Sequence, residues 1–95
     1  MNKYFIYITS YNNNSFRVEL SENIVESINQ LKSDENSSNL KLVFFEVYDT
    51  KEEAIKRKGE METWIKKKIR LIVELYNPGW EDWSNKVDFE NTFIN

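Results

Sequence analysis

The chain has no cysteine and no histidine, and these two absences exclude most of the common catalytic chemistries. Without cysteine it can form neither a disulfide nor a thiolate nucleophile, and we expect a cytoplasmic location. Without histidine it has no imidazole base, no histidine-ligated metal and no Ser-His or Cys-His triad. Any hydrolysis would therefore have to use carboxylates, tyrosine or lysine.

Long apolar runs are missing as well. No run reaches the roughly 18 residues that a membrane-spanning helix needs, so we expect no membrane partner. The first residues, MNKYFIYITS, also lack the cleavage pattern of a signal peptide. With 40% hydrophobic and 15% aromatic residues, the 95-residue chain is expected to pack as one small domain.

The charge is acidic overall but unevenly distributed. A net charge of −3 argues against a general nucleic-acid binder, because phosphate affinity depends on accumulated lysine and arginine. Seven of the 13 basic residues nevertheless lie between Lys56 and Arg70. The sequence can therefore form a local basic surface.

The N-terminal segment predicts an antiparallel hairpin. Residues 4–9 are aromatic and β-branched, and apolar and polar side chains alternate over residues 16–20. The asparagine-rich segment 11–15 lies between them, and asparagine tolerates the left-handed conformations of hairpin turns.

A helix and a loop are predicted next. Ser21 is expected to cap a helix over residues 22–32, whose apolar side chains share one face (Ile24, Ile28 and Leu31). The polar segment 33–39 is expected to be a solvated connector, with substrate contact as its alternative role.

The second half begins with a strand and a capped helix. Residues 40–48 are apolar on both faces, which predicts a central strand. Thr50 and Glu53 have the spacing of a capping box, so a helix is expected from Lys51 towards Trp64.

A further helix and an aromatic tail complete the chain. Ile65, Ile69, Ile72 and Tyr76 recur at helical spacing, and Asn77-Pro78-Gly79 is expected to end this helix. The aromatic residues that follow are expected to fold back over the core, or alternatively to bind a protein partner (Trp80, Trp83, Phe89 and Phe93). The predicted fold is α+β, with order β-β-α-β-α-α and a small three-stranded antiparallel or mixed sheet flanked by three helices. We assign residues 1–83 to the domain and 84–95 to a C-terminal tail.

The run KLVFFEVYDTKEEAIKRKGEMETWIKKKIRLIVELYNPGWEDW resembles the small bacterial single-domain members of the GIY-YIG nuclease superfamily. The matching segments are Leu42–Glu46, Glu52–Arg57, Trp64, Lys66–Lys68 and Asn77–Trp80. The N-terminal half fits more loosely, by element order with a shortened hairpin, so the resemblance spans residues 3–83. It implies a GIY-YIG-like fold and hydrolysis of phosphodiesters with one divalent metal.

The resemblance also implies one active site, and most of its positions carry other residues here. The first motif tyrosine corresponds to Tyr7, whereas the second motif falls on Arg17-Val18-Glu19 and loses its tyrosine and glycine. The position of the charge-stabilising arginine falls on Ser27. The position of the metal-binding glutamate falls on Lys58, which removes the ligand and repels a cation.

The favoured hypothesis is a catalytically inactive GIY-YIG-like domain that binds DNA or RNA, or a protein, and needs no cofactor. Six basic residues are the predicted nucleic-acid contacts: Lys56, Arg57, Lys66, Lys67, Lys68 and Arg70. The same residues could instead form a solvated helical face, partly neutralised by acidic neighbours.

Two alternatives stay open. The chain could be a metal-dependent DNA endonuclease with a rearranged site, in which Glu62, one turn after Lys58, and Glu19 hold Mg²⁺ or Mn²⁺. Arg17 would then replace the missing arginine of the first helix. A third hypothesis is a structural or oligomeric module in which the former active site has become packed interior.

Overall fold

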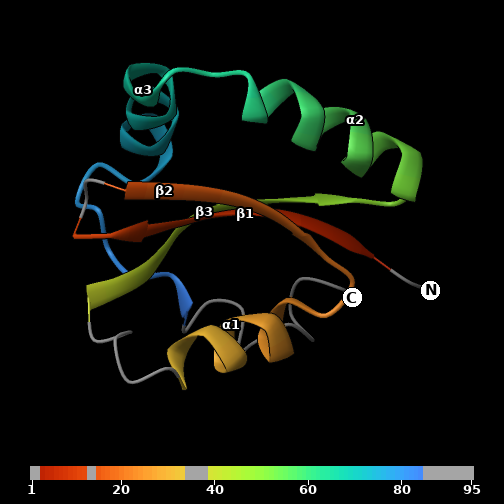
Figure 1. The fold of residues 1–95 in the computed structure, drawn as a ribbon, viewed down its shortest axis with the longest axis horizontal. Coiled ribbons are helices and arrows are strands. Elements are labelled where there is room, and N and C mark those ends of the chain that lie inside the picture. The colour runs from red at the N-terminus through yellow and green to blue at the C-terminus, as the bar shows by residue number, and fades with distance from the viewer. Residues whose placement is uncertain (1–2, 13–14, 34–38, 85–95) are drawn as a thin grey trace.

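In the computed structural model, residues 3–12, 15–33 and 39–84 are described. The elements in chain order are β1 (Tyr4–Tyr11), β2 (Ser15–Ser21), α1 (Ile24–Lys32), β3 (Leu40–Tyr48), α2 (Lys51–Glu62) and α3 (Lys66–Tyr76) (Figure 1). The predicted α+β class and the order β-β-α-β-α-α are confirmed. Within the described ranges, no helix has the length and apolar character to cross a membrane.

The three strands form one antiparallel sheet with β1 in the centre. The order across the sheet is β2-β1-β3, so the prediction that residues 40–48 form the central strand is wrong. Helices α2 and α3 cover one face of the sheet and α1 covers the other (Figure 1). Strand β3 is apolar on both faces because both faces are covered, which does not require a central position.

The outer edge of β3 is covered by the chain that follows α3. Asn77 is 3% exposed and donates from its side-chain amide to the carbonyl oxygen of Val43 at 3.1 Å. The amide of Leu42 donates to the carboxylate of Asp82 at 3.1 Å, and its carbonyl accepts from the amide of Trp83 at 2.7 Å. These bonds satisfy backbone groups that an edge strand would otherwise expose to water.

Strands β1 and β2 form the predicted hairpin. Tyr7 pairs with Glu19 and Thr9 pairs with Arg17 across the two strands. Asn12 has a φ of 59°, the left-handed conformation expected of an asparagine in this turn. Residues 13–14 lie outside the described residues.

The sheet separates two apolar clusters, because successive strand side chains point to opposite faces. The cluster under α2 and α3 contains Ile6, Ile8, Val43, Phe44, Ala54, Met61, Ile69 and Val73. The cluster under α1 contains Phe5, Tyr7, Ile24, Ile28 and Leu42. Trp80 packs against the first cluster and Trp83 against both, as expected for a segment folding back. Phe89 and Phe93 lie outside the described residues, as does most of loop 33–39.

The structure confirms one predicted helix cap and corrects the other. The Glu53 amide donates to the Thr50 hydroxyl at 3.2 Å, and this hydroxyl donates to the Glu53 carboxylate at 2.9 Å. Helix α1 is capped by Asn23 rather than Ser21, since the Glu26 amide donates to the Asn23 side chain at 3.1 Å. Ser21 still belongs to β2, so its backbone is extended and paired and cannot begin the helix.

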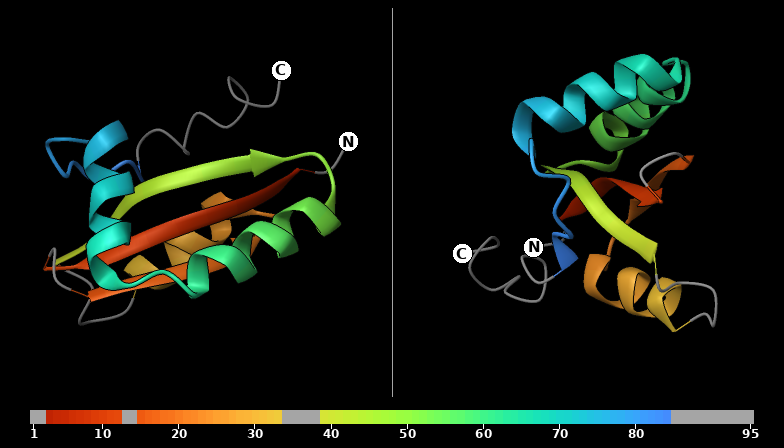
Figure 2. Two further views of the ribbon diagram at one scale, coloured as in Figure 1. Left: turned by 90° about the horizontal axis from the view of Figure 1, so that it is seen from above. Right: turned by 90° about the vertical axis from the view of Figure 1, so that its left-hand side faces the viewer.

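Helix α3 turns part of the predicted face inward, since Ile69 is buried and Ile72 packs against the core, and Val73 joins them. Ile69 and Val73 are its buried residues, whereas Ile65 is 70% and Tyr76 59% exposed. Ile65 precedes the helix, so it does not share the helical periodicity. The helix ends at Asn77, as predicted. Figure 2 shows α2 running along the sheet, with α3 crossing one end of the helical layer.

Candidate functional site

Tyr7 on β1 and Ser27 on α1, two residues predicted at the degenerate site, lie within hydrogen-bond reach of each other. Tyr7 is 5% exposed, and the Ser27 hydroxyl lies 2.7 Å from the hydroxyl of Ser21. Burial and the charge of Glu19 raise the pKa of Tyr7, and the hydrogen bond to Ser27 and the charge of Arg17 offset this only in part. The phenol therefore stays protonated near neutral pH.

Arg17 and Glu19 come from the edge strand β2. Glu19 lies opposite Tyr7 in the hairpin and Arg17 lies opposite Thr9, so both belong to the α1 face of the sheet. The Arg17 side chain is 69% exposed, and its Nε lies 3.7 Å from the Glu19 carboxylate. Arg17 is thus a solvated surface residue paired with its neighbour.

Lys58 lies on α2 and forms an ion pair with Glu62. Its ammonium donates to the Glu62 carboxylate at 2.8 Å, across one helical turn. This hydrogen bond raises the pKa of Lys58, burial opposes the shift, and the charges of Glu62 and Glu19 add to it. A cation is therefore held where the resemblance places the metal-binding carboxylate.

A groove of about 510 Å³ lies between β2 and α2. Its lining residues are Glu19, Leu20, Ile55, Lys58, Gly59 and Glu62. Two carboxylates and one ammonium make it negative rather than positive. Tyr7, Arg17 and Ser27 are not among its lining residues. The predicted site residues therefore lie in a partly buried hydroxyl cluster at α1 and in an ion-paired groove at the β2 edge, and the charge of Glu19 acts on both Tyr7 and Lys58.

The groove supplies only part of what a metal ion needs. Within the described residues, no group of three aspartate, glutamate, histidine or cysteine side chains is placed to hold a metal ion. Glu19 and Glu62 are two oxygen donors, whereas Mg²⁺ prefers octahedral oxygen coordination. Lys58 competes with a cation for both carboxylates.

Arg57, a predicted nucleic-acid contact, binds Glu46 in β3. Its Nε and Nη2 donate to the two carboxylate oxygens at 2.9 and 3.1 Å, with both side chains largely covered. The hydroxyl of the neighbouring Tyr48 also donates to Glu46, at 2.7 Å. Burial and this hydrogen bond raise the pKa of Tyr48 to about 12. The sequence analysis did not predict that Glu46 binds Arg57. The signal that could have indicated this pairing is a carboxylate within an otherwise largely apolar strand.

Three predicted contacts form the lysine cluster, Lys66–Lys68, in the first turn of α3. All three side chains are exposed. No acidic residue stands in this turn, and within the described chain Ile65 provides no side-chain cap. The Lys68 ammonium lies 4.3 Å from the centre of the Trp64 ring, a cation–π geometry.

The remaining two predicted contacts lie elsewhere. The Arg70 guanidinium lies 5.8 Å from the Phe16 ring centre and 5.4 Å from that of Trp80. Lys56 is exposed on α2 and lines a hollow of about 340 Å³ whose other lining residues are Tyr48, Glu53, Arg57 and Glu60. The six predicted contacts therefore do not share one face.

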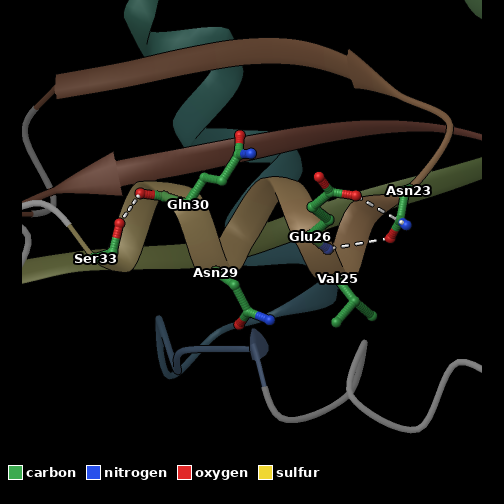
Figure 3. A pocket seen from close by; sticks show the side chains of 6 residues that line it. All are labelled: Asn23, Val25, Glu26, Asn29, Gln30 and Ser33. Atoms are coloured by element: carbon green, nitrogen blue, oxygen red, sulfur yellow. Dashed lines mark hydrogen bonds between the residues drawn. The ribbon is translucent and has the colours of Figure 1, made fainter.

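A further hollow, of about 490 Å³, lies along α1 and is lined by Asn23, Val25, Glu26, Asn29, Gln30 and Ser33. Figure 3 shows Val25 and Asn29 pointing to one side of the helix and Gln30 to the other. The Asn23 side chain caps the helix, and the Ser33 hydroxyl donates to the Gln30 carbonyl at 2.7 Å. These groups serve the ends of α1 and do not converge on a common point.

Comparison with protein-family models, with curated proteins and with solved structures finds no match for this chain. The resemblance to GIY-YIG nucleases rests on the residues quoted above and stays a prediction.

Proposed function

We propose that this chain is a GIY-YIG-like domain that contacts nucleic-acid phosphates without cleaving them. The class rests on the sequence resemblance over residues 3–83. The contact surface is the lysine cluster Lys66–Lys68. The cysteine-free composition favours a cytoplasmic setting.

The Lys58–Glu62 ion pair supports the loss of cleavage. The endonuclease alternative needs the Glu62 carboxylate as a metal ligand, but an ammonium lies 2.8 Å from it. Lys58 also repels a divalent cation at short range. Tyr7 is buried with a raised pKa, so it is a poor base for activating water.

The lysine cluster is the observation that carries phosphate binding. The start of a helix is its positive end, so each cation there costs roughly 0.3–1 kcal/mol of helix stability at low ionic strength. No acidic residue in the same turn offsets this cost. An anion bound there would offset it, because the positive end of the helix and the ammonium groups both favour negative charge.

The solvated-face interpretation is supported on α2 by its ion pairs. On α2, Arg57 pairs with Glu46 and also lies 3.5 Å from Glu60, and Lys58 pairs with Glu62. These cations are already neutralised within the fold.

Salt-dependent binding of short DNA and RNA strands tests the proposal. We expect weak binding, with the logarithm of the association constant falling linearly as the logarithm of salt concentration rises. The slope of this line should be flatter for the triple variant Lys66→Gln/Lys67→Gln/Lys68→Gln. Lys67→Gln and Lys51→Gln form a matched pair, since each removes one exposed lysine from the first turn of a helix. Only Lys67→Gln should weaken binding. Equal effects of the two, or binding indifferent to salt, would contradict the phosphate contact.

Cleavage is tested separately on branched and single-stranded DNA with Mg²⁺ or Mn²⁺. We expect intact substrate at protein concentrations that saturate binding. Cleavage that disappears with Glu62→Ala would establish the endonuclease alternative instead.

A further inference from the structure

Helix α3 carries large apolar side chains on its outer face as well as its inner one. Ile69 and Val73 are buried, whereas Leu71 is 59% and Leu75 is 70% exposed. Leu71 and Leu75 are one turn apart and so lie on the same side of the helix. A helix that is apolar on a second side indicates a partner, because exposed apolar residues that cluster mark interaction surfaces.

An apolar groove lies beside these two leucines. It has a volume of about 260 Å³ and is lined by Trp64, Lys68, Leu71, Ile72 and Leu75. Its one charged group, the Lys68 ammonium, lies over the Trp64 ring and leaves the apolar stem of the lysine along the wall. The groove can therefore accept an aliphatic side chain from a partner.

The charges along α3 indicate what this partner is. Lys67 lies one turn before Leu71, and Glu74 lies nearly one turn after it, on the same side of the leucine pair. When two copies of α3 pack antiparallel about a two-fold axis at Leu71, Lys67 of each copy comes beside Glu74 of the other. Parallel packing would instead bring like charges together. The helix is thus self-complementary in the antiparallel sense that a two-fold interface requires.

The same arrangement fills the groove. In the antiparallel pair Leu71 meets its own counterpart, and Leu75 of one copy reaches the N-terminal part of the other helix, where Trp64 and Lys68 line the groove. The Trp80 indole donates to Oε2 of the Glu74 carboxylate at 3.2 Å, and the carboxylate has a second oxygen, Oε1. That oxygen can accept from the second copy's lysine.

We propose that the chain forms a symmetric dimer through antiparallel packing of α3. A pair of 11-residue helices buries less than a standard interface, so the expected dissociation constant is micromolar or weaker. This proposal does not rest on nucleic-acid binding, although Lys67 and Lys68 belong to both proposed surfaces.

Sedimentation velocity of the full chain over a wide concentration range tests the dimer. The mass should rise from 11.5 kDa towards twice that value. Leu71→Gln and Leu75→Gln should each keep the chain monomeric, with an unchanged circular dichroism spectrum because both side chains are exposed. Ile55→Gln is the matched control, an exposed residue on α2 (52%) that should leave dimerisation unchanged.

Charge reversal gives the sharper test, because it separates this packing from other apolar association. Lys67→Glu and Glu74→Lys should each weaken the dimer by about tenfold or more, since two opposite-charge pairs become like-charge pairs. The double variant Lys67→Glu/Glu74→Lys should restore it. A strictly monomeric chain at millimolar concentration, or a double variant no tighter than the single ones, would overturn the proposal. No nucleic acid is present, so the result does not depend on the proposed function.

Discussion

Replacing Lys58 with glutamate tests most directly whether this position can contribute to a metal site. Lys58→Glu removes the ion pair with Glu62 and brings a third carboxylate beside Glu19 and Glu62. Lys58→Gln is the control, because it removes the same ion pair without adding a negative charge. The comparison therefore isolates the repulsion among carboxylates.

The expected magnitudes are small but measurable. The Lys58 and Glu62 side chains are 28% and 52% exposed, so their pair contributes only about 0.5 kcal/mol after solvent screening. A like charge one turn from Glu62 costs roughly 0.2–0.5 kcal/mol, and proximity to Glu19 adds a similar amount. We therefore expect losses of about 0.5 kcal/mol for Lys58→Gln and 1–1.5 kcal/mol for Lys58→Glu. For a domain of this size, the larger loss lowers the melting temperature by roughly 5–10 °C.

Metal ions should reverse the loss in one variant only. Three carboxylates can hold a hard divalent cation. At ion concentrations about tenfold above a millimolar dissociation constant, binding returns about 1.4 kcal/mol. Urea unfolding at about 20 mM salt, where screening is weak, should show this gain for Lys58→Glu and none for Lys58→Gln. If the two variants are equally stable and neither responds to Mg²⁺ or Mn²⁺, the three positions do not converge and the metal-site interpretation is refuted.

Three further predictions concern stability. Asn77→Ala removes the donor to Val43 and leaves buried carbonyls unpaired, so it should cost about 3 kcal/mol by urea unfolding, whereas the exposed Asn29→Ala should change little. Within the described residues the buried Ser10 hydroxyl has no hydrogen-bond partner, so Ser10→Ala should be neutral or stabilising by up to about 1 kcal/mol; a clear loss would reveal an unseen bond. Burial would raise the pKa of Asp82, but its hydrogen bonds, among them one from Lys32, lower it overall. The wild-type advantage over Asp82→Asn should hold at pH 7 and disappear as the pH falls below about 4, and a constant difference would contradict this.

Local chemistry made much of the fold predictable. The capping box of Thr50 and Glu53, the asparagine turn at Asn12 and the helix end at Asn77 each involve groups close in sequence. Prediction from sequence fails where a residue distant in the chain determines the position of an element. Residues 40–48 look central because both faces are apolar, yet Asn77 and Asp82 satisfy the free edge and allow an outer position.

The candidate site likewise has features that the sequence determines and features that the tertiary structure determines. The sequence by itself determined which residue types are present: a lysine at position 58, no histidine or cysteine, and three lysines together at Lys66–Lys68. Only the tertiary structure decided which of them meet. It buries Tyr7 against Ser27, binds Arg57 to Glu46 and leaves Leu71 exposed. Burial and ion pairing depend on which elements pack together, and a residue's neighbours along the chain do not specify its neighbours across the sheet.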